Sequence, residues 1–340
     1  MAFLHDFGLK IMQAAFLKFL ACPNPSCRGT LKLDAAGSLK SSDKKSREIA
    51  EGFVACQTCR EIYPILKGIV ILVPDVWNYL SRNFLLIKGI CAKYGGLAPQ
   101  TLKTIMSRIS LPLPKQVDYD VSRQRVFERE SSFYRLSHYG DLWKGLSPKE
   151  PLFDFLQQQK GRSPHDVLET FLLNGTRKNG GIAVEVGCNV GGFLKRIAPR
   201  YETLFGVDLN LEVLILAKKL LKGGPVELLL AQGEYLPFAD QTLDLAASVN
   251  VIDLLEKPEE FLKEQTRPLK KGGKLLLAAP YVFAQNLNGR AKNPIQWVKN
   301  MLKGKILLEK EKDPVCWIYR KGPRQYEIFY THCLSAVKRG

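Results

Sequence analysis

The sequence has no long uncharged apolar run and no excess of glycine or proline. Gly accounts for 27 and Pro for 19 of the 340 residues, which excludes a collagen-like chain, and a hydrophobic content of 46% excludes a largely disordered one. The most apolar early stretch, residues 11–21, is interrupted by Lys18 and is shorter than the ~20 residues that a bilayer requires. No small-residue cleavage site follows it. We therefore expect a cytoplasmic protein without a membrane span or a signal peptide.

Acidic residues are scarce outside the centre of the chain, which gives a formal net charge of +17. Residues 1–165 hold 24 basic and 14 acidic residues, residues 166–280 hold 14 and 15, and residues 281–340 hold 12 and 4. The length suffices for two modules, and the central block is neutral while the excess of basic residues lies on its flanks. A basic surface attracts anions such as RNA, but it also forms an ordinary solvated exterior, and both interpretations stay open.

Disulfide bonds are not expected in a reducing compartment, so the eight cysteines need another explanation. Cys22 and Cys27 are spaced as C-x4-C, and Cys56 and Cys59 as C-x-x-C. Two short loops of this kind bring four thiolates to one tetrahedral metal ion, which predicts a zinc ribbon with a closed, structural site. The other four cysteines stand alone and are interpreted as small buried hydrophobes: Cys91, Cys188, Cys316 and Cys333.

The N-terminal module is predicted to span residues 1–75. A strand is expected near residues 31–33, a solvated Lys/Ser-rich loop over 38–47, and one strand-like run over 62–73 that ends at Pro74. A module of about 55 residues buries little core, so the metal should supply much of its folding free energy.

A helical connector is predicted over residues 76–165. Apolar and charged residues alternate at helical spacing in 77–93 and 100–109, and a Pro-rich turn and an aromatic stretch follow. The connector should cover one face of the next domain. His138 and Tyr134 either line a pocket or pack as ordinary residues.

The central block begins with a buried strand that runs into a glycine-rich turn, residues 181–192. Glycine lets the backbone approach a ligand closely, and Asn189 accepts a positive φ at low cost. A second strand over 203–208 ends in Asp208, an acid 23 residues after Glu185 and well placed to accept hydrogen bonds from the two hydroxyls of a ribose.

Further elements follow in a fixed order. A third strand with a Leu-Pro-Phe turn spans residues 227–238, and a fourth strand spans 242–253. A helix over 258–267, a Leu-Lys-Lys-Gly-Gly turn over 269–273 and a fifth strand over 275–279 come next. Residues 180–280 resemble the class I S-adenosylmethionine-dependent methyltransferases, in particular the methyltransferase type 11 group that carries both turns. The G-x-G-x-x-G of dehydrogenases and the G-K-[ST] of P-loop proteins are missing.

The resemblance implies an α/β fold with a Rossmann-like, seven-stranded sheet in residues 166–340. Residues 315–320 and 326–337 would form the antiparallel hairpin that closes the sheet. The implied cofactor is S-adenosylmethionine, and the implied binding residues are Glu185, Gly187, Cys188, Asn189, Gly191, Asp208, Gln232, Glu234 and Asn250. Gln232 stands where the family usually has an Asp facing the adenine amino group, and its carbonyl still accepts one hydrogen bond.

The acceptor side carries no recognisable motif. Methyl transfer needs a general base only when the acceptor must lose a proton. No Asn-Pro-Pro-Tyr follows the fourth strand, and no Pro-Cys or Thr-Cys pair suggests a covalent cysteine mechanism. No catalytic residue is assigned. Asp253, Tyr281 and His332 are the polar residues to test first, with structural roles as the alternative.

Residues 18–75 resemble the small zinc-ribbon proteins that activate tRNA, rRNA and translation-factor methyltransferases as a separate subunit. The C-x4-C knuckle departs from the usual C-x-x-C of that family. A fused activator would cover an apolar edge of the catalytic domain or help to bind substrate. The leading hypothesis is therefore a methyltransferase whose acceptor is unidentified, with a small molecule slightly favoured over RNA or a translation protein. The alternative is a non-catalytic module that docks partners through the ribbon.

Overall fold

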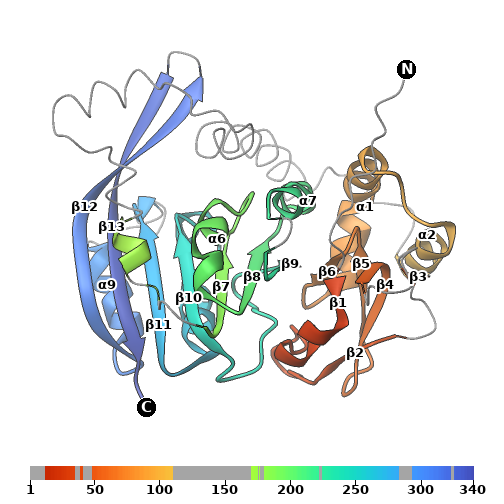
Figure 1. The fold of residues 1–340 in the computed structure, drawn as a ribbon, viewed down its shortest axis with the longest axis horizontal. Coiled ribbons are helices and arrows are strands. Elements are labelled where there is room, and N and C mark those ends of the chain that lie inside the picture. Colours follow the sequence, from red (N-terminus) through yellow and green to blue (C-terminus); the bar gives the residue numbers. More distant parts are fainter. Residues whose placement is uncertain are drawn as a thin grey trace.

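The computed structural model describes residues 12–34, 39–40, 48–109, 170–174, 176, 180–221, 224–282, 293–322 and 325–340. The described strands form one sheet with 13 members that runs through the whole molecule (Figure 1). Eleven of them follow one path in the order β1-β4-β5-β6-β9-β8-β7-β10-β11-β13-β12, and β2 and β3 pair with β4 beside it.

The N-terminal part is built around one long strand that the sequence analysis missed, β4. Its elements are β1 (Met12–Gln13), the 3-10 helix η1 (Ala14–Phe19), β2 (Leu31–Leu33), β3 (Leu39–Lys40), β4 (Glu48–Cys56), β5 (Ile62–Leu66) and β6 (Ile69–Leu72). β1, β2, β3 and β5 all pair antiparallel with β4. The strand predicted near residues 31–33 is confirmed as β2.

Two predictions for this part were wrong. The single strand expected over 62–73 is a hairpin, because Lys67 and Gly68 turn the chain with φ values of 53° and 70°. Two consecutive positive φ angles suit a tight β-hairpin turn. The loop expected over 38–47 contains strand β3 at its start, and residues 41–47 lie outside the described part.

The two helices expected at the start of the connector are confirmed. They are α1 (Val76–Lys93) and α2 (Pro99–Met106). Asp75 begins α1 by accepting a hydrogen bond from the Asn78 N–H at 3.4 Å, which satisfies one of the free amides of the first turn. The Pro-rich turn, the aromatic stretch, Tyr134 and His138 lie outside the described residues.

The C-terminal part alternates strands and helices. Its elements are β7 (Ile182–Val186), α6 (Gly192–Ile197), η2 (Ala198–Arg200), β8 (Thr203–Asp208), α7 (Leu211–Leu220), β9 (Val226–Ala231), β10 (Leu243–Val249), η3 (Ile252–Leu254), α8 (Pro258–Thr266), β11 (Leu269–Ala279), α9 (Pro294–Leu302), β12 (Ile306–Gly322) and β13 (Gln325–Lys338). The five strands and the closing hairpin expected here are confirmed. Helix α7 was missed, although Asn210 caps it by accepting from the Glu212 and Val213 amides.

The expectation of a seven-stranded sheet is corrected. Seven strands come from residues 182–338, but β9 is not the edge of the sheet. Strand β6 pairs parallel with β9, with Val70 opposite Leu229 and Leu72 opposite Ala231. All but the first residue of β9 are buried, and an uncovered apolar edge strand would expose unpaired amides and invite aggregation. The N-terminal part covers that edge.

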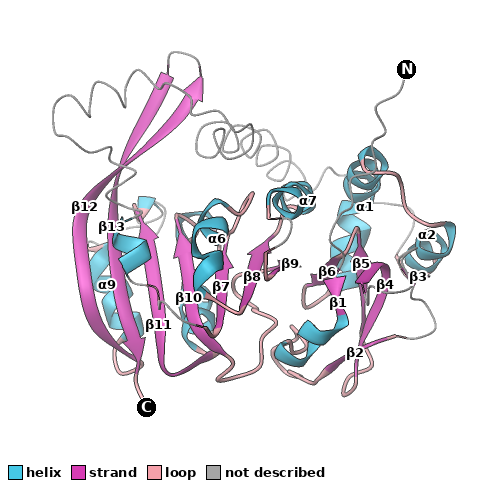
Figure 2. Ribbon diagram, viewed as in Figure 1, coloured by secondary structure: helices cyan, strands magenta, loops and turns pink. Residues whose placement is uncertain are grey.

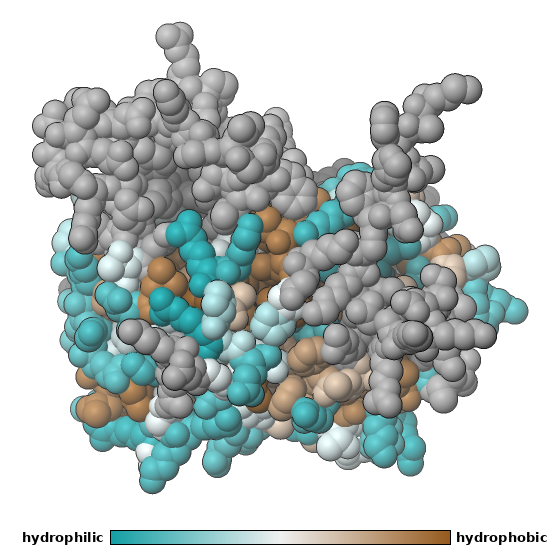
Figure 3. Space-filling model, in the orientation of Figure 1, coloured by the Kyte–Doolittle hydropathy of each residue, from teal (hydrophilic) through white to brown (hydrophobic). Residues whose placement is uncertain are grey.

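Aromatic packing continues the core across the junction. The Phe205 ring on β8 meets the edges of Phe16, Phe19 and Phe238 at centroid distances of 6.0, 6.2 and 5.1 Å. On the face drawn in Figure 3, apolar surface is visible near the middle of the molecule, and polar surface predominates along the lower rim. In the interior, a single hydrophobic cluster contains buried residues from both the N-terminal and the C-terminal part.

The closing hairpin is longer than the sequence predicted. β12 has 17 residues and β13 has 14, and their paired ends project beyond the rest of the sheet (Figure 2). Ile328 and Tyr330 on the projecting part are 56% and 70% exposed. Among the described helices, none combines the length and the apolar character that crossing a bilayer demands.

Candidate cofactor crevice and cysteine cluster

The turn between β7 and α6 has the backbone that a close-fitting ligand loop requires. Gly187, Asn189 and Gly191 have φ values of 77°, 47° and 78°, in the left-handed region that favours glycine and tolerates asparagine. The Gly187 amide donates to the Val207 carbonyl at 2.8 Å, which ties the turn to β8. A Cβ atom on Gly187 would lie 2.1 Å from Cγ2 of Val251, so no side chain fits there.

Glu185 is buried beneath this turn and is 3% exposed. Burial raises the pKa of its carboxyl well above the ordinary value. The hydrogen bond that the carboxyl accepts from the Leu194 backbone N–H lowers the pKa, and the negative charge of Asp208 raises it further. Within the described part of the chain, Glu185 Oε2 has no hydrogen-bond partner. A buried carboxylate oxygen of this kind is ready to receive a donor from a ligand.

Asp208 joins two loops at the carboxyl ends of β7 and β8. Its Oδ2 accepts from the Asn189 N–H at 2.9 Å, and its Oδ1 accepts from the Asn210 N–H at 3.0 Å. Burial raises the pKa of Asp208, and these backbone amides act against the rise by bonding to the charged form. The residue is 6% exposed, and each carboxylate oxygen has lone pairs for further donors.

Cys188 has a side chain that packs into the core. A Cβ on Gly206 of β8 would lie 2.9 Å from its sulfur, so the thiol fills the space above that strand. Burial raises the pKa of the thiol strongly. A cofactor contact by Cys188 is therefore limited to its backbone.

The loop after β9 contains the two residues expected near the adenine. Gln232 and Glu234 are both half-buried, and burial raises the pKa of Glu234, with Glu256 adding to the rise. Gly233 between them has no room for a side chain, because its Cβ would lie 2.9 Å from the Phe261 ring.

Asn250 lies in the loop that follows β10. Its φ is 57°, and its amide donates to the Ala278 carbonyl at 2.7 Å. Three buried side-chain oxygens without a partner in the described residues belong to this set of loops: Glu185 Oε2, Asn189 Oδ1 and Asn250 Oδ1. Glu185 lies near the carboxyl end of β7, and Asn189 and Asn250 follow β7 and β10, the pair of strands at which the chain order of this parallel sheet reverses and where ligands of such folds bind.

The three acceptor-side residues named from the sequence come together in the structure. Tyr281 Oη and His332 Nδ1 are 3.1 Å apart. Burial raises the pKa of Tyr281, and the negative charge of Asp253 makes the next largest contribution to the rise. Sequence reasoning missed Glu311, whose Oε1 lies 2.7 Å from His332 Nε2, because the contact depends on the register between β12 and β13.

The four N-terminal cysteines form a compact cluster. Their sulfur atoms all lie within 4.8 Å of one another, with Cys22 to Cys59 at 3.8 Å and Cys27 to Cys56 at 3.6 Å. Four thiolates at ~2.3 Å from a tetrahedral zinc ion are about 3.8 Å apart, so the donor set and spacing suit zinc. The Tyr63 hydroxyl lies 3.1 Å from the Cys22 sulfur, where it can support that ligand.

An arginine connects this cluster to the Leu-Pro-Phe turn. Arg28, next to Cys27, donates to the Leu236 carbonyl at 2.8 Å and forms an ion pair with Glu264 at 3.0 Å. Glu264 Oε2 accepts from the Leu236 amide at 2.9 Å, and Arg267 also bonds to both Glu264 and the Leu236 carbonyl. The turn that follows Gln232 and Glu234 is thus held partly by the cysteine knuckle.

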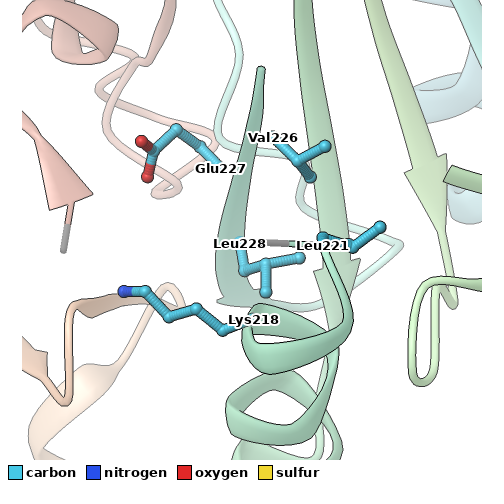
Figure 4. Close-up of a pocket in the computed structure, with 5 residues that line it drawn as sticks. All are labelled: Lys218, Leu221, Val226, Glu227 and Leu228. Carbon is cyan, nitrogen blue, oxygen red and sulfur yellow. The ribbon is translucent and has the colours of Figure 1, made fainter. Parts of the chain in front are cut away.

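A second contact holds the β5-β6 turn against α7. Lys218 Nζ donates to the backbone carbonyls of Lys67 and Gly68 at 3.3 and 2.7 Å. Figure 4 shows Lys218 and Glu227 on the same side of a small cavity that Leu221, Val226 and Leu228 also line. At about 10 Å³ the cavity has room for about one water molecule.

Residues 184–277 match the model of a family described as the methyltransferase domain. An uncharacterized protein of Methanocaldococcus jannaschii is 32% identical over 97 residues, which are 28% of this chain and 43% of that protein. The chain thus spans less than half of the length of this curated relative.

Solved structures are similar at lower identity. A chain from the complex of the Haloferax volcanii Trm112 methyltransferase activator with a methyltransferase is 16% identical, with a TM-score of 0.41, over 55% of this chain and 95% of that one. The N-methyltransferase NodS from Bradyrhizobium japonicum is 14% identical, with a TM-score of 0.42, over 52% and 97%.

Proposed function

We propose that this chain binds S-adenosylmethionine in the crevice at the carboxyl ends of β7, β8 and β10 and transfers its methyl group to an acceptor. The observation that carries the proposal is the convergence of Glu185, Asn189 and Asp208 in the segment that matches the methyltransferase domain. The described residues leave buried oxygens there without a hydrogen-bond donor. The ammonium group and the ribose hydroxyls of the ligand would supply such donors.

The residues fit the cofactor in character. Asp208 would accept from the ribose hydroxyls, and Glu185 and the turn over Gly187, Asn189 and Gly191 would hold the amino-acid part. Gln232 and Glu234 would face the adenine, and Asn250 would lie beside the methyl group. Burial favours the neutral forms of Glu185 and Asp208, and a positively charged ligand beside them would favour the ionised forms and bind to them.

The cofactor supplies a methyl group on a positively charged sulfur. The protein's task is alignment and water exclusion, because the reaction is an in-line displacement. Rigid turns with positive φ at Gly187, Asn189 and Gly191 hold one side of the crevice in place, and the Val251 contact with Gly187 closes it toward β10.

We also propose that Cys22, Cys27, Cys56 and Cys59 bind one structural zinc ion. Four thiolates complete a tetrahedron and leave no position for a substrate. In this proposal residues 1–75 form a ribbon module, 76–165 a connector and 166–340 the catalytic domain, in a cytoplasmic protein. The acceptor is proposed as a small molecule, with RNA or a translation protein as the second choice because of the basic flanks.

Calorimetric titration with S-adenosylhomocysteine tests the cofactor. We expect one binding site per chain and a rise in the melting temperature that grows with ligand concentration. If the titration gives no heat and the melting temperature does not change, the proposal is contradicted. That result would favour the hypothesis of a docking module without a cofactor.

A further inference from the structure

A hydrogen-bonded chain connects three side chains from distant segments at one end of the sheet, two of them buried and one exposed. Tyr281 follows β11, His332 lies on β13, and Glu311 lies on β12. Tyr281 Oη to His332 Nδ1 is 3.1 Å, and His332 Nε2 to Glu311 Oε1 is 2.7 Å. Tyr281 and His332 are 3% and 1% exposed, so the hydrogen bond between them lies in a low-dielectric environment, whereas Glu311 at the outer end of the chain is exposed.

This chain adjoins the proposed cofactor crevice. His332 pairs with Ala279 at the carboxyl end of β11, and the preceding residue, Ala278, accepts from the Asn250 amide at 2.7 Å. Val251 packs over Gly187, and the charge of Asp253, two residues further on, is felt by Tyr281. The crevice and the Tyr281–His332 pair therefore share one wall, formed by the loop after β10.

The protonation pattern follows from the partners. The Lys299 hydrogen bond is the largest cause that lowers the pKa of Glu311, so this carboxylate is ionised and only accepts. His332 must then carry its proton on Nε2, which leaves a lone pair on Nδ1. Tyr281 remains a phenol, because burial and the charge of Asp253 raise its pKa, and it donates to that lone pair.

We propose that Tyr281, His332 and Glu311 form a proton relay on the acceptor side of the crevice. The inference rests on the proposed methyl transfer. The acceptor would attack through an oxygen or nitrogen that carries a hydrogen, and its lone pair would form the new bond to the methyl carbon while sulfur keeps the electrons of the old one. The acceptor's proton would pass to Tyr281 Oη as the phenol proton passes to His332 Nδ1. Glu311 would balance the imidazolium charge.

The relay defines the class of acceptor. A hydroxyl or N–H group needs to lose a proton, whereas a thioether or a carboxylate does not. Tyr281 would be the residue that touches the acceptor, and His332 and Glu311 would act through it. Among the described residues, His332 contacts Tyr281 and Glu311, Glu311 pairs with Lys299, and the other charged and titratable groups that act on Tyr281 are Asp253, Asp313 and Cys333.

Nuclear magnetic resonance of imidazole nitrogens tests the relay without an identified acceptor. Two samples of protein labelled with 15N-histidine are compared at one fixed pH, one saturated with S-adenosylhomocysteine and the other with S-adenosylmethionine, and His332→Gln identifies the resonances. The two ligands differ by one positive charge. Because the proposed relay adjoins the crevice that holds this charge, the Nδ1 and Nε2 chemical shifts of His332 should differ between the two complexes.

Equal His332 nitrogen shifts in the two complexes would overturn the relay. If calorimetry shows that neither ligand binds, the proposed function itself fails. If both ligands bind and the shifts are equal, only the relay fails.

Tyr281→Phe provides a second measurement. Removing the phenol proton from Nδ1 should move the Nδ1 chemical shift of His332 and change its tautomer balance at neutral pH. The matched control is Tyr201→Phe, which removes a hydroxyl from another buried tyrosine, 5% exposed, just before the amino end of β8. The control should leave the His332 chemical shifts unchanged. If Tyr281→Phe leaves them unchanged as well, the relay is contradicted.

Discussion

The cysteine cluster and the crevice are two polar sites in one molecule, and they differ in how their polar atoms are satisfied. The four sulfurs lie within 4.8 Å of one another and form a closed ligand set. The crevice instead keeps buried oxygens of Glu185, Asn189 and Asn250 without a partner in the described residues. A closed set supports folding, whereas acceptors left open support the binding of a ligand that comes and goes.

The largest effect is expected from Cys56→Ser. Structural zinc in small modules supplies ~10–16 kcal/mol of apparent binding free energy, so losing one thiolate should release the metal and unfold the ribbon. Because β6 pairs with β9, the rest of the sheet should also melt at a lower temperature. Metal analysis and thermal melting measure both.

The control is Cys91→Ala, which removes a buried thiol that belongs to no cluster among the described residues. It should keep about one zinc per chain. Metal content near one per chain in Cys56→Ser as well would show that the cluster does not bind zinc through Cys56.

Arg28→Ala tests whether the two sites are linked. The side chain is 23% exposed and pairs with Glu264, which is 10% exposed, so its loss should cost about 2–3 kcal/mol of unfolding free energy. Because Arg28 also holds the Leu236 carbonyl, the affinity for S-adenosylhomocysteine should fall. Arg28→Lys keeps the positive charge but cannot make both contacts at once. Its stability and its affinity should lie between those of the wild type and of Arg28→Ala. Unchanged denaturation midpoints in Arg28→Ala would refute the link.

Gly187→Ala should damage the crevice and spare the cluster. The new Cβ would meet Val251 at 2.1 Å, and overpacking together with a positive φ costs about 1–3 kcal/mol. Ligand affinity should drop and zinc content should not. Gly96→Ala has a similar φ of 74° with nothing within 4 Å of the new atom, so it isolates the backbone strain. Equal losses in both variants would show that the Val251 contact is unimportant.

A smaller effect concerns protons. The raised pKa of Glu185 means that the folded protein keeps this proton at a pH where the unfolded chain has lost it, so stability falls as pH rises from the unfolded to the folded pKa. A cation bound beside Glu185 lowers its pKa and releases the proton. Calorimetry of S-adenosylmethionine in buffers of different ionisation enthalpy should detect this release, and Glu185→Gln should abolish it. Buffer-independent heats for the wild type would count against a cation at Glu185.

Local patterns in the sequence predicted the strands of the C-terminal part and the cysteine cluster, although they missed β4 and α7. Strand β8 begins and ends where expected, and the four cysteines gather as their spacing indicated. Hydrophobic runs and short ligand loops are local properties, so they are visible in one stretch of chain.

Long-range pairing was not predictable in the same way. The joining of β6 to β9, the Arg28–Glu264 pair and the Glu311–His332 contact each depend on how distant segments meet. The Lys67-Gly68 turn was missed because apolar residues flank it on both sides and conceal the break. Tyr281 and His332 were noticed as polar residues, but no sequence signal showed that they touch.

The most direct test of the account is the affinity of Asp208→Ala for S-adenosylhomocysteine, compared with Glu202→Ala. Glu202 is an exposed carboxylate just before the opposite end of the same strand. Asp208→Ala loses hydrogen bonds from the ribose to a charged group, which are worth about 1.5–3 kcal/mol. Its affinity should therefore fall roughly 10- to 100-fold or more, while Glu202→Ala should bind like the wild type. Equal affinity in a folded Asp208→Ala protein would contradict the proposed crevice.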